Sequence, residues 1–255
     1  MAFLAGIRIY PIKALDPLEV REWRIAPSGG LALDRRWALV GEDGSFVNGK
    51  NDPAVHRLRA SFDPDGTAVT WEGLRFEFDR DRAFLEEWFG GQLGRRVRLE
   101  RNDGPGFLDD LEAPGPTVVG TATLETVASW FPPLTLEGTR RRFRANLEIG
   151  GVEPFWDDRL YAKKGEAVRF RIGNVLVEGT NPCRRCAVPS RDPDTGAALS
   201  GFQKTFFERR RETLPSWAEP TRFDTYYRLT VNTRIPPSEA GKVVRVGDPV
   251  RFQTQ

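Results

Sequence analysis

Proline and glycine interrupt this sequence so often that only short secondary-structure elements are expected. The 255 residues include 25 glycines and 19 prolines, and most apolar stretches between them alternate with a period of two. Such alternation is typical of half-buried β-strands, whereas an amphipathic helix repeats its apolar positions every three or four residues. The pattern therefore predicts a mainly β protein of the α+β class with few short helices.

The first half of the chain shows strand patterns and one helix. The helix is predicted over residues 81–89, where the apolar side chains share one face and Gly90-Gly91 would end it. Glu42-Asp43-Gly44 indicates a hairpin turn between two of the strands. The expected strands are 6–10, 18–25, 37–40, 45–47, 68–78 and 97–99.

Residues 101–117 are rich in Gly, Pro and Asp and show little periodicity, so they predict a linker or mobile loop. This places two domains at 1–105 and 117–255. In the second half, short helices are expected over 123–131, before Pro132-Pro133, and over 202–211. The expected strands are 144–149, 167–178, 226–234 and 243–252, the last turned at Gly247-Asp248.

Composition limits the class of function. The apolar fraction of 39% is too high for a disordered chain, and the net charge of +2 gives no global attraction to nucleic acid or to an anionic membrane. The longest apolar run, residues 1–7, is too short for a spanning helix and lacks the preceding charge of a signal peptide. Two cysteines are too few to stabilise a chain of this length by disulfide bonds, so we expect a soluble protein of the reducing cytoplasm.

Two sequence features favour ordinary structural roles. Residues 44–50 match the first seven positions of a phosphate-binding loop, but Asn51 stands where Ser or Thr should hold Mg²⁺. The following Asp52-Pro53 disfavours the helix that should receive the phosphate, so a hairpin is the better interpretation. His56, the single histidine, has no catalytic or metal-binding partner at a suggestive spacing, and we predict a half-buried or surface histidine.

The pair Cys183-Arg184-Arg185-Cys186 admits four interpretations. A structural zinc site needs more Cys or His ligands than this chain offers, and the Pro- and Gly-containing segment after Cys186 does not start the helix of a thioredoxin-like dithiol. An inert buried pair stays open, because cysteine is often a small core residue. The fourth interpretation is a thiolate ligand for a transition metal on an anionic cofactor, which the neighbouring arginines would attract.

Four arginines occur among residues 140–144, just before an apparent strand. Guanidinium groups bind phosphate through paired hydrogen bonds, so an anionic ligand is one interpretation and a solvated charged surface is the other. If 144–149 forms a strand, Arg144 and Asn146 share one face of it. That arrangement would suit a strand that faces a ligand.

Six segments of the chain occur in an ordered set. They are Ile9-Tyr-Pro-Ile-Lys13, Leu33-Asp-Arg-Arg-Trp37, Arg142-Phe-Arg-Ala-Asn146, Asn181-Pro-Cys-Arg-Arg-Cys186, Asp192-Pro-Asp-Thr-Gly196 and Val246-Gly-Asp-Pro-Val250. Together they resemble the MOSC domain, the molybdenum cofactor sulfurase C-terminal domain, with its N-terminal β-barrel-like partner, as in the mitochondrial amidoxime-reducing component and its bacterial relatives. The resemblance implies a β-barrel MOSC domain beside a smaller β-barrel-like domain.

The resemblance implies a molybdopterin form of the molybdenum cofactor. Cys186 would ligate molybdenum with Cys183 beside it, and Arg184 would add a cation near the metal. The contacts to the pterin phosphate and its surroundings would come from Lys13, Arg35, Arg144 and Asn146.

The chain also departs from the family pattern at four positions. Ala14 stands where a Ser is common, Ala145 replaces a Pro, Arg184 replaces a small residue, and Lys50 replaces an Arg. These departures bear more on the choice of substrate than on the binding of the cofactor.

The expected function is molybdenum-dependent reduction of N-hydroxylated or N-oxide substrates by oxygen-atom transfer. Electrons would come from a separate reductase or ferredoxin, and Asp192 or Asp194 would help to deliver protons. A different class of function is a cofactor or sulfur carrier in which Cys186 bears a persulfide. A third is a β-barrel adaptor with incidental cysteines, and fold analogy alone does not separate these.

Overall fold

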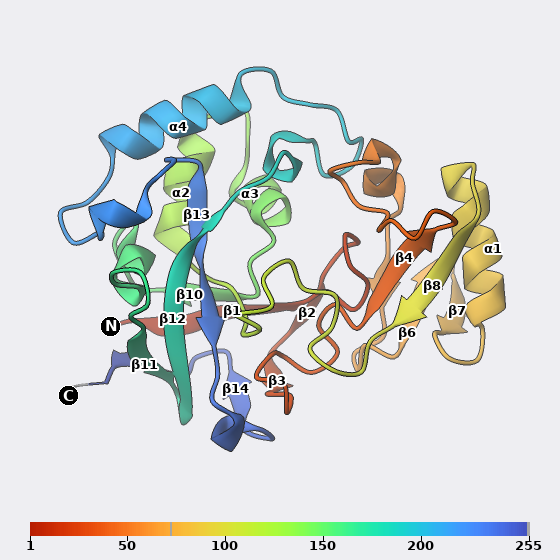
Figure 1. Ribbon diagram of the computed structural model, residues 1–255, viewed down its shortest axis with the longest axis horizontal. Helices are drawn as coiled ribbons and strands as arrows, with labels where there is room; N and C mark the ends of the chain where they lie inside the picture. Colours follow the sequence, from red (N-terminus) through yellow and green to blue (C-terminus); the bar gives the residue numbers. More distant parts are fainter. Residues whose placement is uncertain (72, 254–255) are drawn as a thin grey trace.

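Strands dominate the computed structural model, which describes residues 1–71 and 73–253 (Figure 1). The mainly β, α+β class predicted from the sequence is confirmed. The strands are β1 Phe3–Ile9, β2 Leu18–Val20, β3 Glu22–Arg24, β4 Trp37–Gly41, β5 Ser61–Phe62, β6 Ala68–Trp71, β7 Leu74–Glu77, β8 Val97–Arg101, β9 Val118–Gly120, β10 Leu147–Gly150, β11 Val168–Ile172, β12 Val175–Arg184, β13 Arg228–Arg234, β14 Val243–Arg245 and β15 Val250–Phe252. The helices are α1 Arg82–Leu93, α2 Thr121–Ser129, α3 Leu136–Phe143, α4 Phe202–Glu212 and the short 3-10 turns η1 Pro53–Arg57, η2 Trp156–Leu160, η3 Val188–Ser190, η4 Pro220–Arg222 and η5 Pro237–Glu239.

The largest sheet joins the two ends of the chain. Over the described residues it has eight strands in the order β15-β11-β12-β13-β9-β10-β1-β2, and α2, α3 and α4 lie beside it (Figure 1). Strand β1 pairs antiparallel with β10, and β9 pairs parallel with β10. The sheet is open, with β15 and β2 at its edges, so the described strands do not close into the barrels that the resemblance implied.

A second region is built from β4 to β8 and α1, at the right of Figure 1. Its core contains Trp37 from β4 and Leu85 and Phe89 from α1, each at most 2% exposed. Helix α1 continues through Gly90-Gly91, where the sequence predicted its end, and stops at Gly94 with φ 65°. The helix continues because its apolar face stays packed, and the stop comes where a residue adopts the left-handed conformation that glycine favours.

Several predicted strands prove to be hairpins. Segment 68–78 divides into the antiparallel pair β6 and β7, with residue 72 outside the described residues. Segment 167–178 likewise divides into β11 and β12. Segment 243–252 turns as predicted, but β14 then pairs with β3 and β15 with β11. The helices predicted over 123–131 and 202–211 are confirmed as α2 and α4.

The predicted strand over 144–149 is wrong in its first half. Residues 140–143 belong to α3, which begins after Thr135, whose side chain accepts a hydrogen bond from the Gly138 amide at 3.0 Å. The strand β10 starts only at Leu147. A run of arginines has good helix propensity, and Thr135 is the capping residue that marks the start of the helix in the sequence.

The segment 101–117, predicted to be a linker, is hydrogen-bonded at both ends. The Phe107 amide donates to the Arg35 carbonyl at 2.8 Å, and the end of the segment packs against the large sheet. The Gly115 amide donates to the Thr233 carbonyl at 2.9 Å, and the Thr233 hydroxyl donates to the Pro116 carbonyl at 2.6 Å. A Cβ at Gly115 would lie 2.4 Å from Thr233 Oγ1, so only glycine permits this approach. The segment therefore sits between the two regions. The boundary between domains at 1–105 and 117–255 stays a prediction, and β1 and β2 of the first join the sheet of the second.

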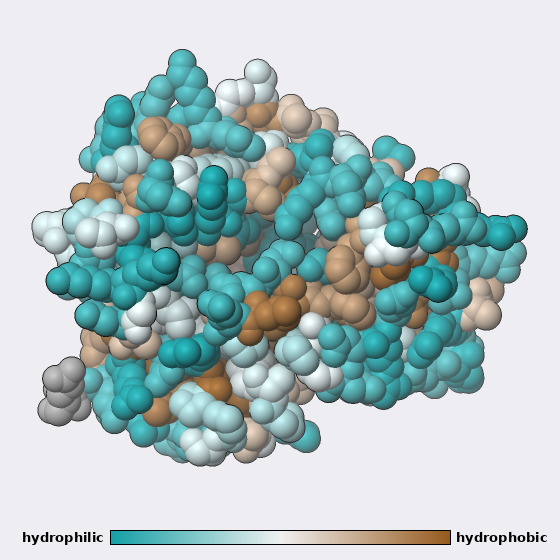
Figure 2. All heavy atoms as spheres, viewed as in Figure 1, coloured by the Kyte–Doolittle hydropathy of each residue, from teal (hydrophilic) through white to brown (hydrophobic). Residues whose placement is uncertain are grey.

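Hydrophilic residues cover most of the face seen in Figure 2, which is hollowed near its centre. None of the helices that the structure describes has the length and apolar character needed to cross a bilayer.

Candidate functional site

A cavity of about 390 Å³ lies between the two regions, within the size range of small-molecule sites. Most of its lining comes from residues 13–17 after β1, from residues 48–58, from residues 108–117, from residues 141–146, and from the end of β12 with the residues that follow it. The structure brings seven of the eight predicted site residues to this cavity: Lys13, Arg35, Arg144, Asn146, Cys183, Arg184 and Cys186. Asp192 is not among the lining residues.

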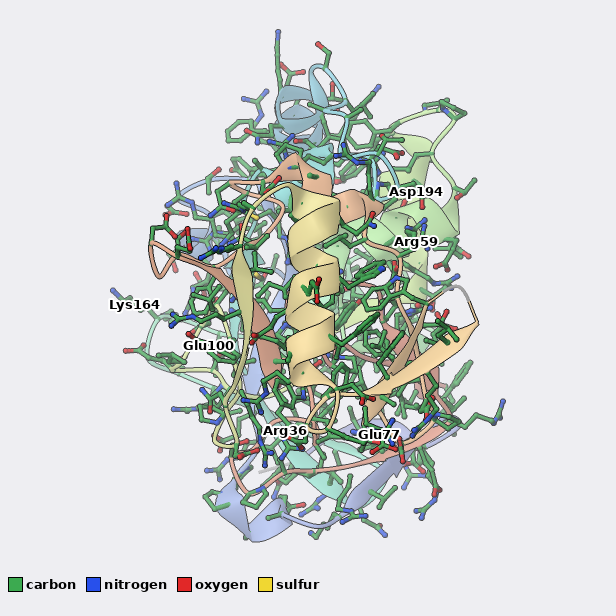
Figure 3. All side chains as sticks on the ribbon, turned by 90° about the vertical axis from the view of Figure 1, so that its right-hand side faces the viewer. Arg36, Arg59, Glu77, Glu100, Lys164 and Asp194 are labelled. Carbon is green, nitrogen blue, oxygen red and sulfur yellow. The ribbon has the colours of Figure 1, made fainter. Side chains whose placement is uncertain are left out.

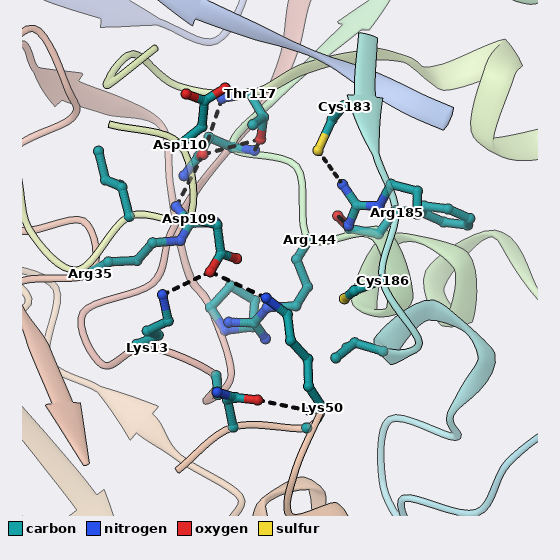
Figure 4. Close-up of a pocket in the computed structure, with 18 of the residues that line it drawn as sticks. Lys13, Arg35, Lys50, Asp109, Asp110, Thr117, Arg144, Cys183, Arg185 and Cys186 are labelled. Atoms are coloured by element: carbon teal, nitrogen blue, oxygen red, sulfur yellow. Dashed lines mark hydrogen bonds and ion pairs between the residues drawn. The ribbon is translucent and has the colours of Figure 1, made fainter. Parts of the chain in front are cut away.

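The amino-terminal wall of the cavity consists of Lys13, Arg35 and Lys50. Lys13 Nζ donates to the Phe107 carbonyl at 2.8 Å and to Asp109 at 3.0 Å, and Lys50 Nζ lies 3.5 Å from the same carboxylate oxygen (Figure 4). Burial lowers the pKa of Lys13, although Asp109 opposes this shift. Both ammonium groups therefore already have an acidic partner.

Arg35 is held by two groups of the protein. Its guanidinium forms an ion pair with the buried Asp34 and donates to Asn146 Oδ1 at 3.3 Å. Asn146 is only 1% exposed, and its amide group donates to the Arg8 carbonyl at 3.0 Å and accepts from the Thr117 amide at 3.2 Å. Asn146 thus ties Arg35 to the large sheet, and most of its hydrogen-bonding capacity is used within the protein.

The carboxy-terminal wall consists of Arg144, Cys183, Arg184, Arg185 and Cys186. Arg144 follows α3 directly, and its guanidinium lies over the ring of Tyr10 at 4.1 Å. Among the described residues, no carboxylate forms an ion pair with Arg144, Arg184 or Arg185. Burial lowers the pKa of Arg144, because the protein supplies no strong counter-charge. This wall therefore presents cations without acidic partners to the cavity.

The two thiols differ in their surroundings. Cys183, at the end of β12, accepts a hydrogen bond from Arg185 Nη1 at 3.3 Å, and Arg185 Nη2 donates to the Phe143 carbonyl at 2.9 Å (Figure 4). Cys186 lies beyond the strand, half-buried, and has no hydrogen-bond partner among the described residues. Cys186 is therefore the thiol that is open to a ligand in the cavity.

Unusual backbone conformations gather around this cavity. Ala14, Arg35 and Arg144 all line it with positive φ angles of 74°, 52° and 56°. Residues other than glycine adopt this region at a cost of about 1 kcal/mol or more, and such positions cluster at functional sites. The left-handed conformation of Arg144 also replaces the shared strand face that the sequence predicted for Arg144 and Asn146.

Asp192 shapes a turn outside the cavity. Its carboxylate accepts hydrogen bonds from the Thr195 amide at 2.9 Å and from the Thr195 hydroxyl at 3.0 Å. The neighbouring Asp194 pairs with Arg141 at 2.8 Å and with Arg59, so it links the two regions (Figure 3). The structure therefore does not bring Asp192 to the predicted thiol ligand.

Sequence reasoning missed three acidic residues of the cavity, Asp16, Asp109 and Asp110. Asp109 and Asp110 lie in the segment predicted to be a linker, and Asp110 Oδ2 accepts from Asn232 Nδ2 at 2.9 Å. Two adjacent acidic residues inside a Gly- and Pro-rich segment were the only local signal. Their position depends on the contact of Gly115 with β13, which the sequence does not reveal.

His56 is half-buried, as predicted, and it also lines the cavity. It packs against Gly49, where a Cβ would approach His56 Nε2 to 2.4 Å. Burial, together with the charges of Arg144 and Arg191, lowers the pKa of His56 to about 4. The hairpin that precedes it is confirmed by the bridge between Val40 and Phe46, so the phosphate-binding-loop interpretation gains no support.

Among the described residues, no group of three or more His, Cys, Asp or Glu side chains could hold a metal ion.

Comparisons with known proteins follow the same division of the chain. Residues 1–85 match the MOSC N-terminal beta barrel domain, and residues 118–251 match the MOSC domain. A molybdenum cofactor sulfurase from Arabidopsis thaliana is 24% identical in an alignment of 247 positions that covers 76% of this chain and 29% of that protein. The mitochondrial amidoxime-reducing component 1 of Mus musculus is 24% identical in an alignment of 296 positions that covers 97% of this chain and 81% of that protein.

The chain thus spans less than a third of the length of the sulfurase that it matches. A crystal structure of the YUAD protein from Bacillus subtilis aligns with a TM-score of 0.42 at 11% identity, over 100% of this chain and 98% of that chain. The MOSC domain match alone extends over more than half of the sequence. The protein therefore belongs to the MOSC domain family.

Proposed function

We propose that this protein is a molybdenum cofactor-dependent oxidoreductase that reduces N-hydroxylated or N-oxide substrates by oxygen-atom transfer. The names of its relatives connect the family with the molybdenum cofactor and with amidoxime reduction. The observation that carries the proposal is the carboxy-terminal wall, where the open thiol of Cys186 and cations without acidic partners line one cavity. A metal that is bound by the thiolate and carried on an anionic cofactor would account for both the thiol and the cations.

The residues present fit such a cofactor. A molybdopterin carries a phosphate, and guanidinium groups that lack a carboxylate partner bind phosphate well. Arg144 is such a group. Arg35 lies against the same Tyr10 ring as Arg144, and Lys13 lines the same cavity. A soft metal that the cofactor already chelates needs only one further thiolate, for which Cys186 is placed.

The protein would hold the cofactor, orient it and exclude water. When bound, the cofactor would supply two-electron redox chemistry at its metal. The positive φ angles of Arg35 and Arg144 fix the directions of their side chains before a ligand arrives. Residues 102–117 cover the cavity between the two regions, because Gly115 and Pro116 anchor them to β13.

Electrons would come from a separate protein, a reductase or a ferredoxin. The two matched family domains together account for most of the chain, and neither is a flavin, haem or iron–sulfur module. We expect the purified protein to turn over with a chemically reduced viologen and not with NADH alone. Direct activity with NADH would contradict this part of the proposal.

A second candidate function is a carrier of the cofactor or of sulfur, with a persulfide on Cys186. The similarity to the sulfurases, over 76% of this chain, favours keeping this candidate. The open position of Cys186 suits a persulfide as well as a metal ligand. The two candidates differ in whether the isolated protein retains molybdenum.

The deciding experiment measures molybdenum and pterin in protein purified from a host that makes the cofactor. We expect near-stoichiometric amounts in the wild type and loss of most of the metal in Cys186→Ala, because the thiolate is its protein ligand. Cys183→Ala is the matched control, since the Cys183 sulfur already accepts from Arg185. Persulfide on Cys186 without molybdenum would support the carrier, and a folded wild type without either would refute both functions.

A further inference from the structure

Arg184 lines the cavity, and its charge contributes, after that of Arg228, to the lowered pKa of Asp224. It is exposed at the end of β12, and its side chain makes no hydrogen bond or ion pair with any described residue. Its exposure and its place in the lining put it at the rim, where the cavity meets the solvent. A guanidinium fork at the entrance of a cavity is suited to binding an anion.

The neighbouring strand places a second arginine opposite the first. Arg184 and Arg228 are directly paired in the register of β12 and β13. Like charges at opposite positions destabilise a sheet, so this pairing has a cost that an anion would offset. Arg228 is already engaged, because it donates to the Pro182 carbonyl at 2.7 Å and pairs with Asp224 at 2.7 Å.

The rim is distinct from the groups assigned to the cofactor phosphate. Lys13 and Arg35 lie in the amino-terminal wall, and Arg144 lies over the buried Tyr10. The sequence assigned Arg184 to the cofactor, but its exposure favours a ligand that enters from the solvent. Among the residues that the structure describes, Asp224 is the one acidic side chain that forms an ion pair with either arginine of this rim.

We propose that Arg184, supported by Arg228, binds a carboxylate group of the substrate, so that anionic N-hydroxylated compounds are preferred over neutral ones. This inference rests on the proposed function, because it names the substrate class of the same cavity. The carboxylate is unchanged in the reaction. The N–O bond breaks, and the oxygen leaves as water after the addition of two protons and of two electrons from the reduced donor.

The test compares benzamidoxime with its 4-carboxy derivative, using the cofactor-loaded protein and reduced viologen as electron donor. We expect the wild type to reduce the carboxylate with a kcat/KM about fivefold higher, and Arg184→Gln to remove this preference. Arg184→Lys should keep part of it, since the charge remains and the fork is lost. Arg211→Gln is the matched control, because Arg211 is an exposed arginine that lies outside the cavity lining.

A second measurement does not depend on turnover. Calorimetry should show that 4-carboxybenzamidine, the product, binds the wild type and Arg211→Gln about fivefold more tightly than Arg184→Gln. If no N-hydroxylated compound is reduced, the proposed function fails and this binding difference still decides the role of Arg184. Equal binding by all variants, or loss of pterin from Arg184→Gln, would overturn the inference.

Discussion

The two walls of the cavity balance their positive charges in different ways. In the amino-terminal wall, Arg35 pairs with Asp34, and Lys13 and Lys50 share Asp109. In the carboxy-terminal wall, the arginines have no carboxylate partner among the described residues. A half-buried charge without a partner costs free energy unless a ligand supplies the opposite charge. The first wall therefore contributes to folding, and the second is arranged for binding.

The largest expected effect is the loss of folding stability when an ion pair of the amino-terminal wall is broken. Arg35→Met should lower the free energy of unfolding of the cofactor-free protein by about 3 kcal/mol, because Asp34 would keep a buried charge without its cation. Urea denaturation measures this change, with Arg211→Met as the control. A loss below about 1 kcal/mol would mean that this wall is not needed for folding.

An arginine-to-methionine substitution in the carboxy-terminal wall should weaken binding of the cofactor and leave folding nearly unchanged. Arg144→Met should leave the free energy of unfolding of the cofactor-free protein within about 1 kcal/mol of the wild type, since no ion pair is broken. It should reduce the pterin retained on purification about tenfold, because a charge-assisted contact to phosphate is lost. Oxidised-pterin fluorescence gives the retained amount, and equal retention would remove Arg144 from the cofactor site.

The burial of His56, together with the charge of Arg144, should be visible in the pH dependence of stability. His56 has a pKa of about 4 in the folded protein, against 6.5 when unperturbed. The unfolded chain therefore binds more protons between pH 4 and 6.5, and stability falls as the pH falls through this window. After allowance for solvent screening we expect a loss of about 1 kcal/mol, which His56→Gln should remove.

Two groups modify that dependence. Asp192 faces His56 and favours its charged form, so it opposes the lowering of the pKa. Burial raises the pKa of Asp157 to about 6, so this group makes stability rise as the pH falls. This contribution is the same in the wild type and in His56→Gln, and it cancels when the two stability curves are compared. Because the chain has a single histidine, its ring signal in an NMR titration reports the pKa directly. A midpoint near 6.5 would contradict the predicted influence of the arginines.

The smallest expected effect concerns the carboxylate that occupies the amino-terminal wall. Asp109 competes with any bound anion for Lys13 and Lys50. Asp109→Asn should therefore raise the affinity of the cofactor-free protein for inorganic phosphate about threefold, as expected when the ion pairs of this exposed carboxylate with the two lysines are removed. Calorimetric titration with phosphate measures the change. An unchanged affinity would show that the carboxylate does not share the anion site.

The sequence predicted elements best where one periodicity ran without interruption. Helices α2 and α4 and strand β4 came out at or close to their predicted positions, because their apolar spacing is regular. The prediction was wrong at α3, because the run of arginines before Arg144 carries little apolar periodicity and only the capping Thr135 marks the start of the helix. It also failed at the end of α1, since packing carried the helix past two glycines.

The family and the residue types of the site could be read from the sequence, because the motifs around Cys186, Arg144 and Lys13 are short and local. Which of these residues come together depends on the tertiary structure. Pairing of β1 with β10 and the contact of Gly115 with Thr233 bring three distant segments to one cavity, and the same packing leaves Asp192 outside. Charge pairing across the walls depends on distances between segments far apart in the chain, and local sequence does not encode these distances.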